Sequence, residues 1–153
     1  MKFRATALAL ALAAGTTVVA ASLGAFAQGK PADAVPYRKA IFQINKWQMG
    51  MLSGMAKGDI AFNAAAANKA TAALRDASML VGDAFPAGSG DGETKAKPEI
   101  WQKSADFAKA VEMIQTAAKA AAATTIGSKD DIGKVLPALG AACKNCHDNF
   151  RKS

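Results

Sequence analysis

The sequence of 153 residues has few of the side chains that build metal and redox sites: two cysteines and a single histidine. A closed Cys/His zinc site needs four such ligands, which this chain cannot supply. Long runs of β-branched residues are also missing, so the strand-then-helix setting of a thioredoxin-like CxxC pair is not expected. The lysines are scattered rather than clustered, which argues against a nucleic-acid-binding stripe.

The two cysteines and the histidine lie together near the C-terminus, as Cys143-x-x-Cys146-His147. On a helix, Cys143 and Cys146 would share one face and His147 would lie beside them. This spacing is typical of covalent haem attachment, in which each sulfur adds to a vinyl group and the histidine binds the iron. The motif therefore predicts one covalent haem c, held by Cys143 and Cys146, with His147 as an axial iron ligand.

The N-terminal segment has the features of a secretory signal. Lys2 and Arg4 precede an apolar stretch over 5–19, and Ala25-Phe26-Ala27 has the small-x-small form of a cleavage site. We expect residues 1–27 to be removed, which leaves a single periplasmic domain over 28–153 without membrane attachment. An uncleaved anchor is the alternative, because the apolar stretch is nearly long enough to span a bilayer. Loss of Lys2 and Arg4 would lower the formal net charge of +7 by two, leaving a mildly basic surface.

The remaining sequence predicts an all-α protein. Abundant alanine, helical periodicity and Gly or Pro breaks predict helices over 33–57, 63–81, 98–123 and 128–150. The segment 82–97 is rich in glycine and reads as a long surface connection. Four helices of this length favour an antiparallel four-helix bundle whose core holds the covalently bound haem.

Local features refine this prediction. Ser128, with Asp131 three residues later, predicts a capped helix start, whereas Pro137 predicts a kink or restart within the last helix. Met79 and Met113 are expected in the core. Two apolar stripes are expected, one on each of the first two helices: Arg38, Phe42, Asn45, Met49 and Leu52, and then Ala66, Ala70, Ala73, Ala77 and Leu80.

Several stretches, in their order along the chain, resemble the cytochrome c′ family of class II c-type cytochromes. They are Tyr37-Arg38, Phe85-Pro86, Pro98-Glu99-Ile100-Trp101 and the segment 143–151. The resemblance implies that Arg38 reaches a haem propionate and that Arg151 lies by the proximal face of the haem. Phe85 and Trp101 are expected to contact the cofactor or the core around it. The family is often a homodimer formed through its first two helices, so we expect a homodimer here.

The resemblance also bears on the sixth iron position. Low-spin relatives take a methionine from the first helix, four residues after the position that matches Arg38, and here that residue is Phe42. A phenyl ring cannot bind iron, so we expect a five-coordinate, high-spin haem that binds nitric oxide or carbon monoxide, transfers electrons, or does both. The alternative is a six-coordinate, Met-ligated carrier of the cytochrome c-556 type, with Met49 as the rival ligand.

A haem enzyme is the weaker prediction. A peroxidase normally uses a second histidine to move the peroxide proton, and His147 is the only histidine in the chain. We therefore predict a protein that is not an enzyme. The sequence does not identify a redox partner protein.

Overall fold

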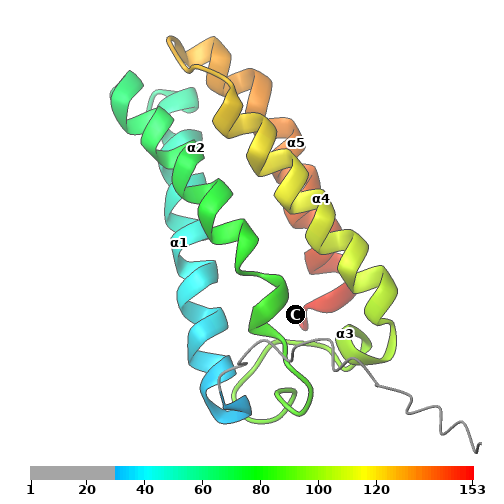
Figure 1. The fold of residues 1–153 in the computed structure, drawn as a ribbon. Coiled ribbons are helices and arrows are strands. Elements are labelled where there is room, and N and C mark those ends of the chain that lie inside the picture. Colours follow the sequence, from blue (N-terminus) through cyan, green and yellow to red (C-terminus); the bar gives the residue numbers. More distant parts are fainter. Residues whose placement is uncertain (1–29) are drawn as a thin grey trace, which may run out of the picture.

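The computed structural model describes residues 30–153; the predicted signal sequence lies outside them. Four long helices form an antiparallel bundle (Figure 1), which confirms the predicted all-α architecture. The helices are α1 (Pro31–Lys57), α2 (Ala64–Met79), the single-turn α3 (Glu99–Gln102), α4 (Ser104–Ala123) and α5 (Lys129–Phe150), with a short 3₁₀ turn η1 (Gly82–Ala84) after α2.

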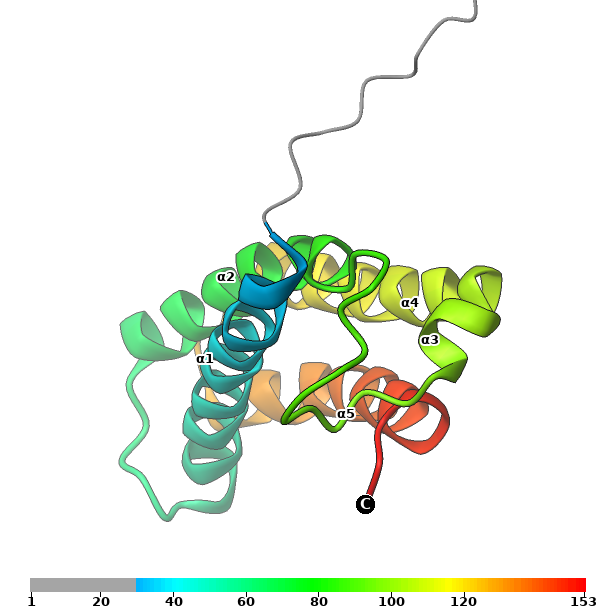
Figure 2. The same cartoon turned by 90° about the horizontal axis from the view of Figure 1, so that it is seen from below.

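Each long helix packs against two others. Helix α1 contacts α2 and α5, and α4 contacts the same two helices from the other side. The loop that follows η1 runs across the end of the bundle where the chain also terminates (Figures 1 and 2). None of the helices in residues 30–153 has the length and hydrophobicity that a membrane crossing requires.

The helix ends follow from local chemistry. Asn63 caps α2 by accepting a hydrogen bond from the Ala66 amide at 2.8 Å. Gly58 ends α1 with φ 88°, a left-handed conformation that suits glycine. The predicted cap of α5 is confirmed: Ser128 Oγ accepts from the Asp131 amide, and the Asp131 carboxylate accepts from the Ser128 hydroxyl.

Several predicted helix limits differ from the structure. Helix α1 begins at Pro31 rather than Asp33, because proline suits the first turn. The third helix is split at Lys103, whose φ of −118° and ψ of 50° are not helical. Helix α5 continues through Pro137 without a restart. Pro137 and Gly133 are both exposed, so the Gly133 carbonyl that loses its amide donor faces water.

The core consists of two hydrophobic clusters. We call one the turn half, because it lies beside the α1–α2 and α4–α5 turns; it is mainly aliphatic and includes Leu52, Met55, Leu74, Ile126, Ile132 and Leu139. We call the other the loop half, because it lies under the long loop; it includes Ile41, Val81, Ile100, Phe107, Val111 and Phe150.

The expected core positions need correction. Met79 and Met113 are 44% and 46% exposed, so they are not core residues. Leu80 is also exposed, and the buried stripe of α2 instead consists of Ala67, Ala70, Thr71, Leu74, Ala77 and Ser78. On α1 the stripe holds Ile41 in place of Phe42, which is 37% exposed. The helical spacing of the predicted stripes was right. Several predicted stripe residues were wrong by one position, because neighbouring residues on these helices are similarly apolar.

Candidate functional site

The CxxCH motif lies on the last two turns of α5, as predicted. Cys143 and Cys146 are free thiols, each partly buried, and Cys146 packs against the loop half. Burial raises the pKa of both thiols, and that of Cys146 reaches about 11. A raised pKa disfavours the thiolate, which is the form that a dithiol redox site uses.

His147 lies on the exposed side of the same helix. Partial burial, and then the charge of Arg151, lower the pKa of the imidazole. Arg151 Nη1 is 3.5 Å from His147 Nδ1. A neutral imidazole can bind a metal through Nε2 when Nδ1 carries the proton, and in that tautomer Arg151, which has only donors, does not hydrogen-bond to Nδ1.

Backbone hydrogen bonds join the C-terminal residues to the end of the long loop. Ala96 and Arg151 form an isolated antiparallel bridge. The Lys97 amide donates to the Phe150 carbonyl at 3.0 Å, and the Lys152 amide donates to the Lys95 carbonyl at 2.7 Å. These bonds fix the backbone of Arg151 one turn after His147.

Arg38 is buried, with 4% exposure, although it is a permanent cation. Its Nη2 donates to both the carbonyl and the hydroxyl of Ser89 at 2.7 Å, and Nη1 donates to Thr94 Oγ1 at 3.3 Å. The guanidinium also lies over Phe85, 4.5 Å from the ring centroid. Sequence reasoning missed Ser89 and Thr94, because a serine and a threonine in a glycine-rich loop carry no periodic signal.

No carboxylate in the described chain pairs with Arg38. Its hydrogen-bond partners are neutral, and burial lowers its pKa. A buried cation without a counter-charge is unfavourable. Arg38 is therefore suited to an anionic group at this position.

Aromatic side chains connect Arg38 to the rest of the site. Phe42 is 6.2 Å from Phe85, and Phe85 lies edge-on to both Trp101 and Phe107, at 6.4 Å and 4.9 Å between centroids. Trp101 Nε1 donates to the Pro86 carbonyl at 3.1 Å. The structure thus brings four of the predicted residues, Arg38, Phe42, Phe85 and Trp101, into one group.

Gly90 closes the loop over this group. A Cβ atom at Gly90 would lie 3.1 Å from the Trp101 ring. Only glycine lets the backbone approach the indole so closely without displacement.

The methionines of α1 lie away from this group. Met49 and Met51 pack against the turn half, and Met55 is buried within it. Of these three, none belongs to the loop half that Cys146 contacts.

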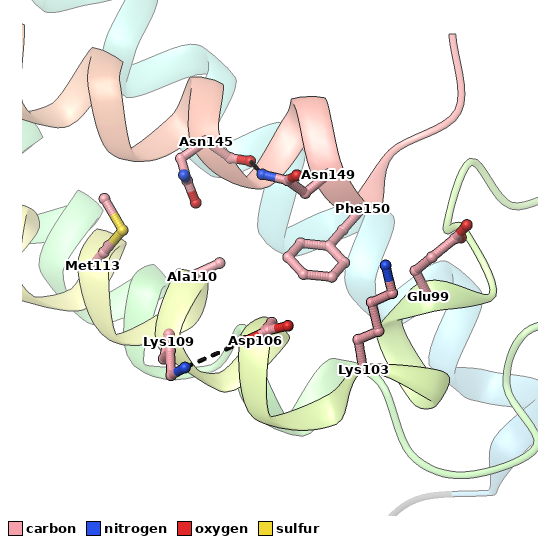
Figure 3. A pocket seen from close by; sticks show the side chains of 9 residues that line it. All are labelled: Glu99, Lys103, Asp106, Lys109, Ala110, Met113, Asn145, Asn149 and Phe150. Atoms are coloured by element: carbon pink, nitrogen blue, oxygen red, sulfur yellow. Dashed lines mark hydrogen bonds and ion pairs between the residues drawn. The ribbon is translucent and has the colours of Figure 1, made fainter.

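A separate polar pocket lies between α3, α4 and α5 (Figure 3). Asn145 on α5 and Met113 on α4 point into it, and its Lys109 and Asp106 form an ion pair at 3.3 Å. Neither cysteine nor His147 lines this pocket. Asn145 projects from a different face of α5 than the CxxCH side chains, so the pocket is not the site of the motif.

The residues present fit a covalently attached haem. Two free thiols one turn apart can form both thioether bonds, and the adjoining imidazole can bind the iron. The buried Arg38 can receive a propionate, and aromatic rings surround it. Arg151 lies beside the imidazole.

Comparison with known proteins agrees with this arrangement. A family model described as cytochrome C′ matches residues 33–151. The cytochrome c′ of Pararhodospirillum photometricum is 39% identical over 124 residues, which are 80% of this chain and 98% of that protein. The structure of cytochrome c prime from Shewanella frigidimarina has a TM-score of 0.75 and 34% identity, covering 81% of this chain and 98% of that one.

Two similar structures contain gases. One is a nitric oxide complex of a cytochrome c prime variant from Alcaligenes xylosoxidans, with a TM-score of 0.73 and 31% identity. The other is a carbon monoxide-bound variant from the same organism, with a TM-score of 0.70 and 32% identity. Each comparison covers 82% of this chain and 98% of the other.

Proposed function

Because this chain belongs to the cytochrome c′ family, we propose that it binds small gases and transfers electrons at a five-coordinate, high-spin haem iron. Two observations carry the proposal: His147 is the only histidine in the sequence, and the non-ligating Phe42 lies next to Phe85, whose ring also contacts Arg38. The nitric oxide and carbon monoxide complexes of relatives support gas binding.

The haem supplies an iron that changes oxidation state and binds diatomic gases. Cys143 and Cys146 would hold it by thioether bonds, and His147 would bind the iron. Arg38, already oriented by Ser89, neutralises a propionate. Arg151 would lie on the proximal side of the haem, where its position near Nδ1 limits the rotation of the imidazole.

Phe42 controls access on the α1 side. Its ring contacts Phe85 and is partly exposed, so it can move without disturbing a buried cluster. A bulky apolar side chain excludes water and slows entry of ligands that must displace it. The Met-ligated alternative is less favoured, because Met49 packs against the turn half.

Electron transfer is consistent with the charges around the motif. The C-terminal bridge places Lys95, Lys97 and Lys152 close to Arg151, whereas the sequence had suggested only scattered lysines. Such a cationic region favours approach of an acidic redox protein. We propose that the protein works in the periplasm, after cleavage at residue 27, and is not an enzyme.

A homodimer is also proposed. Tyr37, Ile44 and Trp47 lie on the outer side of α1 with 42%, 46% and 66% exposure. Their spacing of seven and three residues gives one apolar stripe, which a second copy can cover. Sedimentation of the holoprotein at micromolar concentration should show a dimer, and a monomer alone would contradict this.

Spectroscopy of the purified holoprotein tests the iron assignment. We expect absorption and electron-spin-resonance spectra of a high-spin ferric haem, and formation of carbon monoxide and nitric oxide complexes. A low-spin ferric signal with a Met-to-iron charge-transfer band would contradict the five-coordinate site. Peroxide turnover far above that of free haem would instead favour the enzyme alternative.

A further inference from the structure

Asn45 is a polar residue on the inward side of α1. It follows the buried Ile41 by four residues and precedes the buried Leu52 by seven, so the three side chains share one face of the helix. Ile41 belongs to the loop half and Leu52 to the turn half. Asn45 therefore lies at the boundary between the two clusters.

The side-chain oxygen of Asn45 has no hydrogen-bond partner within the described residues. This Oδ1 atom is buried, and no hydrogen-bond donor reaches it among residues 30–153. A buried acceptor without a donor is unfavourable. The buried end of the Asn45 amide is therefore left without a partner from residues 30–153, and rotation about χ2 can place either the oxygen or the NH₂ group there.

The haem-attachment motif lies at the same boundary on the facing helix. Leu139 of α5 belongs to the turn half, and Cys146 packs against the loop half. Cys143 falls between them, on a helix that packs against α1. The unpaired Asn45 oxygen and the first haem-binding cysteine are therefore at equivalent heights in the bundle.

We propose that Asn45 is a specificity-determining residue of the haem site, whose amide forms a hydrogen bond with the small molecule bound on the α1 side of the haem. This inference rests on the proposed function. The amide carries an acceptor and a donor and can exchange them by rotation about χ2. Its NH₂ group can thus donate to the oxygen of a bound gas. The α1 side of the site is then not purely apolar.

The test compares Asn45→Leu with the native holoprotein. Loss of a hydrogen-bond donor should shift the infrared C–O stretch of the carbon monoxide complex to higher wavenumber and speed carbon monoxide dissociation by roughly two- to tenfold. The control is Gln43→Leu, which removes an exposed amide two residues away and should change neither quantity. Asn45→Gln, which keeps an amide, should change the C–O stretch and the dissociation rate less than Asn45→Leu does.

Unfolding by urea separates this role from a structural one. Removal of an unpaired buried acceptor should leave the midpoint of Asn45→Leu unchanged or higher. A lower midpoint, or an unchanged C–O stretch and dissociation rate, would overturn the inference. Failure of the native holoprotein to bind carbon monoxide would contradict the proposed function itself, so the two failures are distinguishable.

Discussion

Two asparagines show how the two halves of the bundle differ. In the turn half, Asn68 donates from Nδ2 to the Ala64 and Ile126 carbonyls at 2.7 and 2.9 Å, and its Oδ1 accepts from the Ile126 amide at 3.0 Å. At the edge of the loop half, Asn45 Oδ1 is buried without a partner within the described chain. The polypeptide therefore supplies hydrogen-bond partners for the Asn68 amide in the turn half, but it supplies none for the Asn45 oxygen at the edge of the loop half.

The side chains of the two halves differ in the same way. The turn half is closed by aliphatic residues that are almost fully buried, such as Leu52 and Leu139. The loop half combines aromatic rings with the unpaired cation of Arg38. We infer from this difference that the polypeptide alone forms the core of the turn half, whereas the cofactor would complete the loop half.

The largest expected effect comes from removing both thioether bonds. Cys143→Ala together with Cys146→Ala should make the haem extractable by acid–acetone, whereas the native protein should keep it after denaturation. Each single variant should show intermediate retention. Hydrogen exchange should show the greater loss of protection in the loop half, and equal loss in both halves would contradict the comparison.

Matched core truncations on α1 should separate the halves energetically. Leu52→Ala should cost about 2–5 kcal/mol in the free energy of unfolding of both the apoprotein and the holoprotein. Ile41→Ala should cost a similar amount in the holoprotein and clearly less in the apoprotein, because its surroundings need the haem. Urea unfolding of both forms measures this, and equal costs for Ile41→Ala would contradict it.

Asn68→Leu should destabilise the turn half by about 1–3 kcal/mol. The substitution removes the side-chain partners of the Ile126 amide and carbonyl. Thermal unfolding should show the loss, while the haem absorption spectrum stays unchanged. A changed spectrum would show that the halves are coupled more closely than we infer.

Phe42→Ala should act on ligand entry rather than on stability. Removal of the ring should speed carbon monoxide binding by roughly tenfold, which corresponds to a barrier lower by about 1.4 kcal/mol. Phe62→Ala, an aromatic truncation beside the turn half, should leave the rate unchanged. Stopped-flow absorption measures both, and equal rates for Phe42→Ala and the native protein would remove Phe42 from the entry path.

The smallest effect is expected at the α5 cap. The Lys134 ammonium, the Ser128 hydroxyl and the Gly127 amide together lower the pKa of Asp131 to about 2. A depressed pKa in the folded state stabilises the protein above the ordinary pKa of about 3.9, and that contribution is lost as the pH falls towards 2. Asp131→Asn should therefore be less stable than the native protein near neutral pH, and the difference should shrink as the pH falls from about 4 through 2. A pH-independent difference would contradict this.

Sequence alone was sufficient where the cause is local. The CxxCH spacing, the helical periodicity and the Ser128–Asp131 cap each involve residues within one turn of one another, so their geometry follows from helix parameters. The family resemblance predicted that Arg38, Phe42 and Arg151 belong to the haem site.

Only the tertiary structure determined what those residues contact. Arg38 meets Ser89 across 51 positions of the chain, and the C-terminal bridge joins Ala96 to Arg151. The helices packed around α2 determine which of its faces is buried. The sequence does not show this face, because alanine occurs on several faces of α2. Asn45 looks like an ordinary helix residue until the packing buries its oxygen without a donor, because a missing partner is a property of the assembled fold and not of any stretch of sequence.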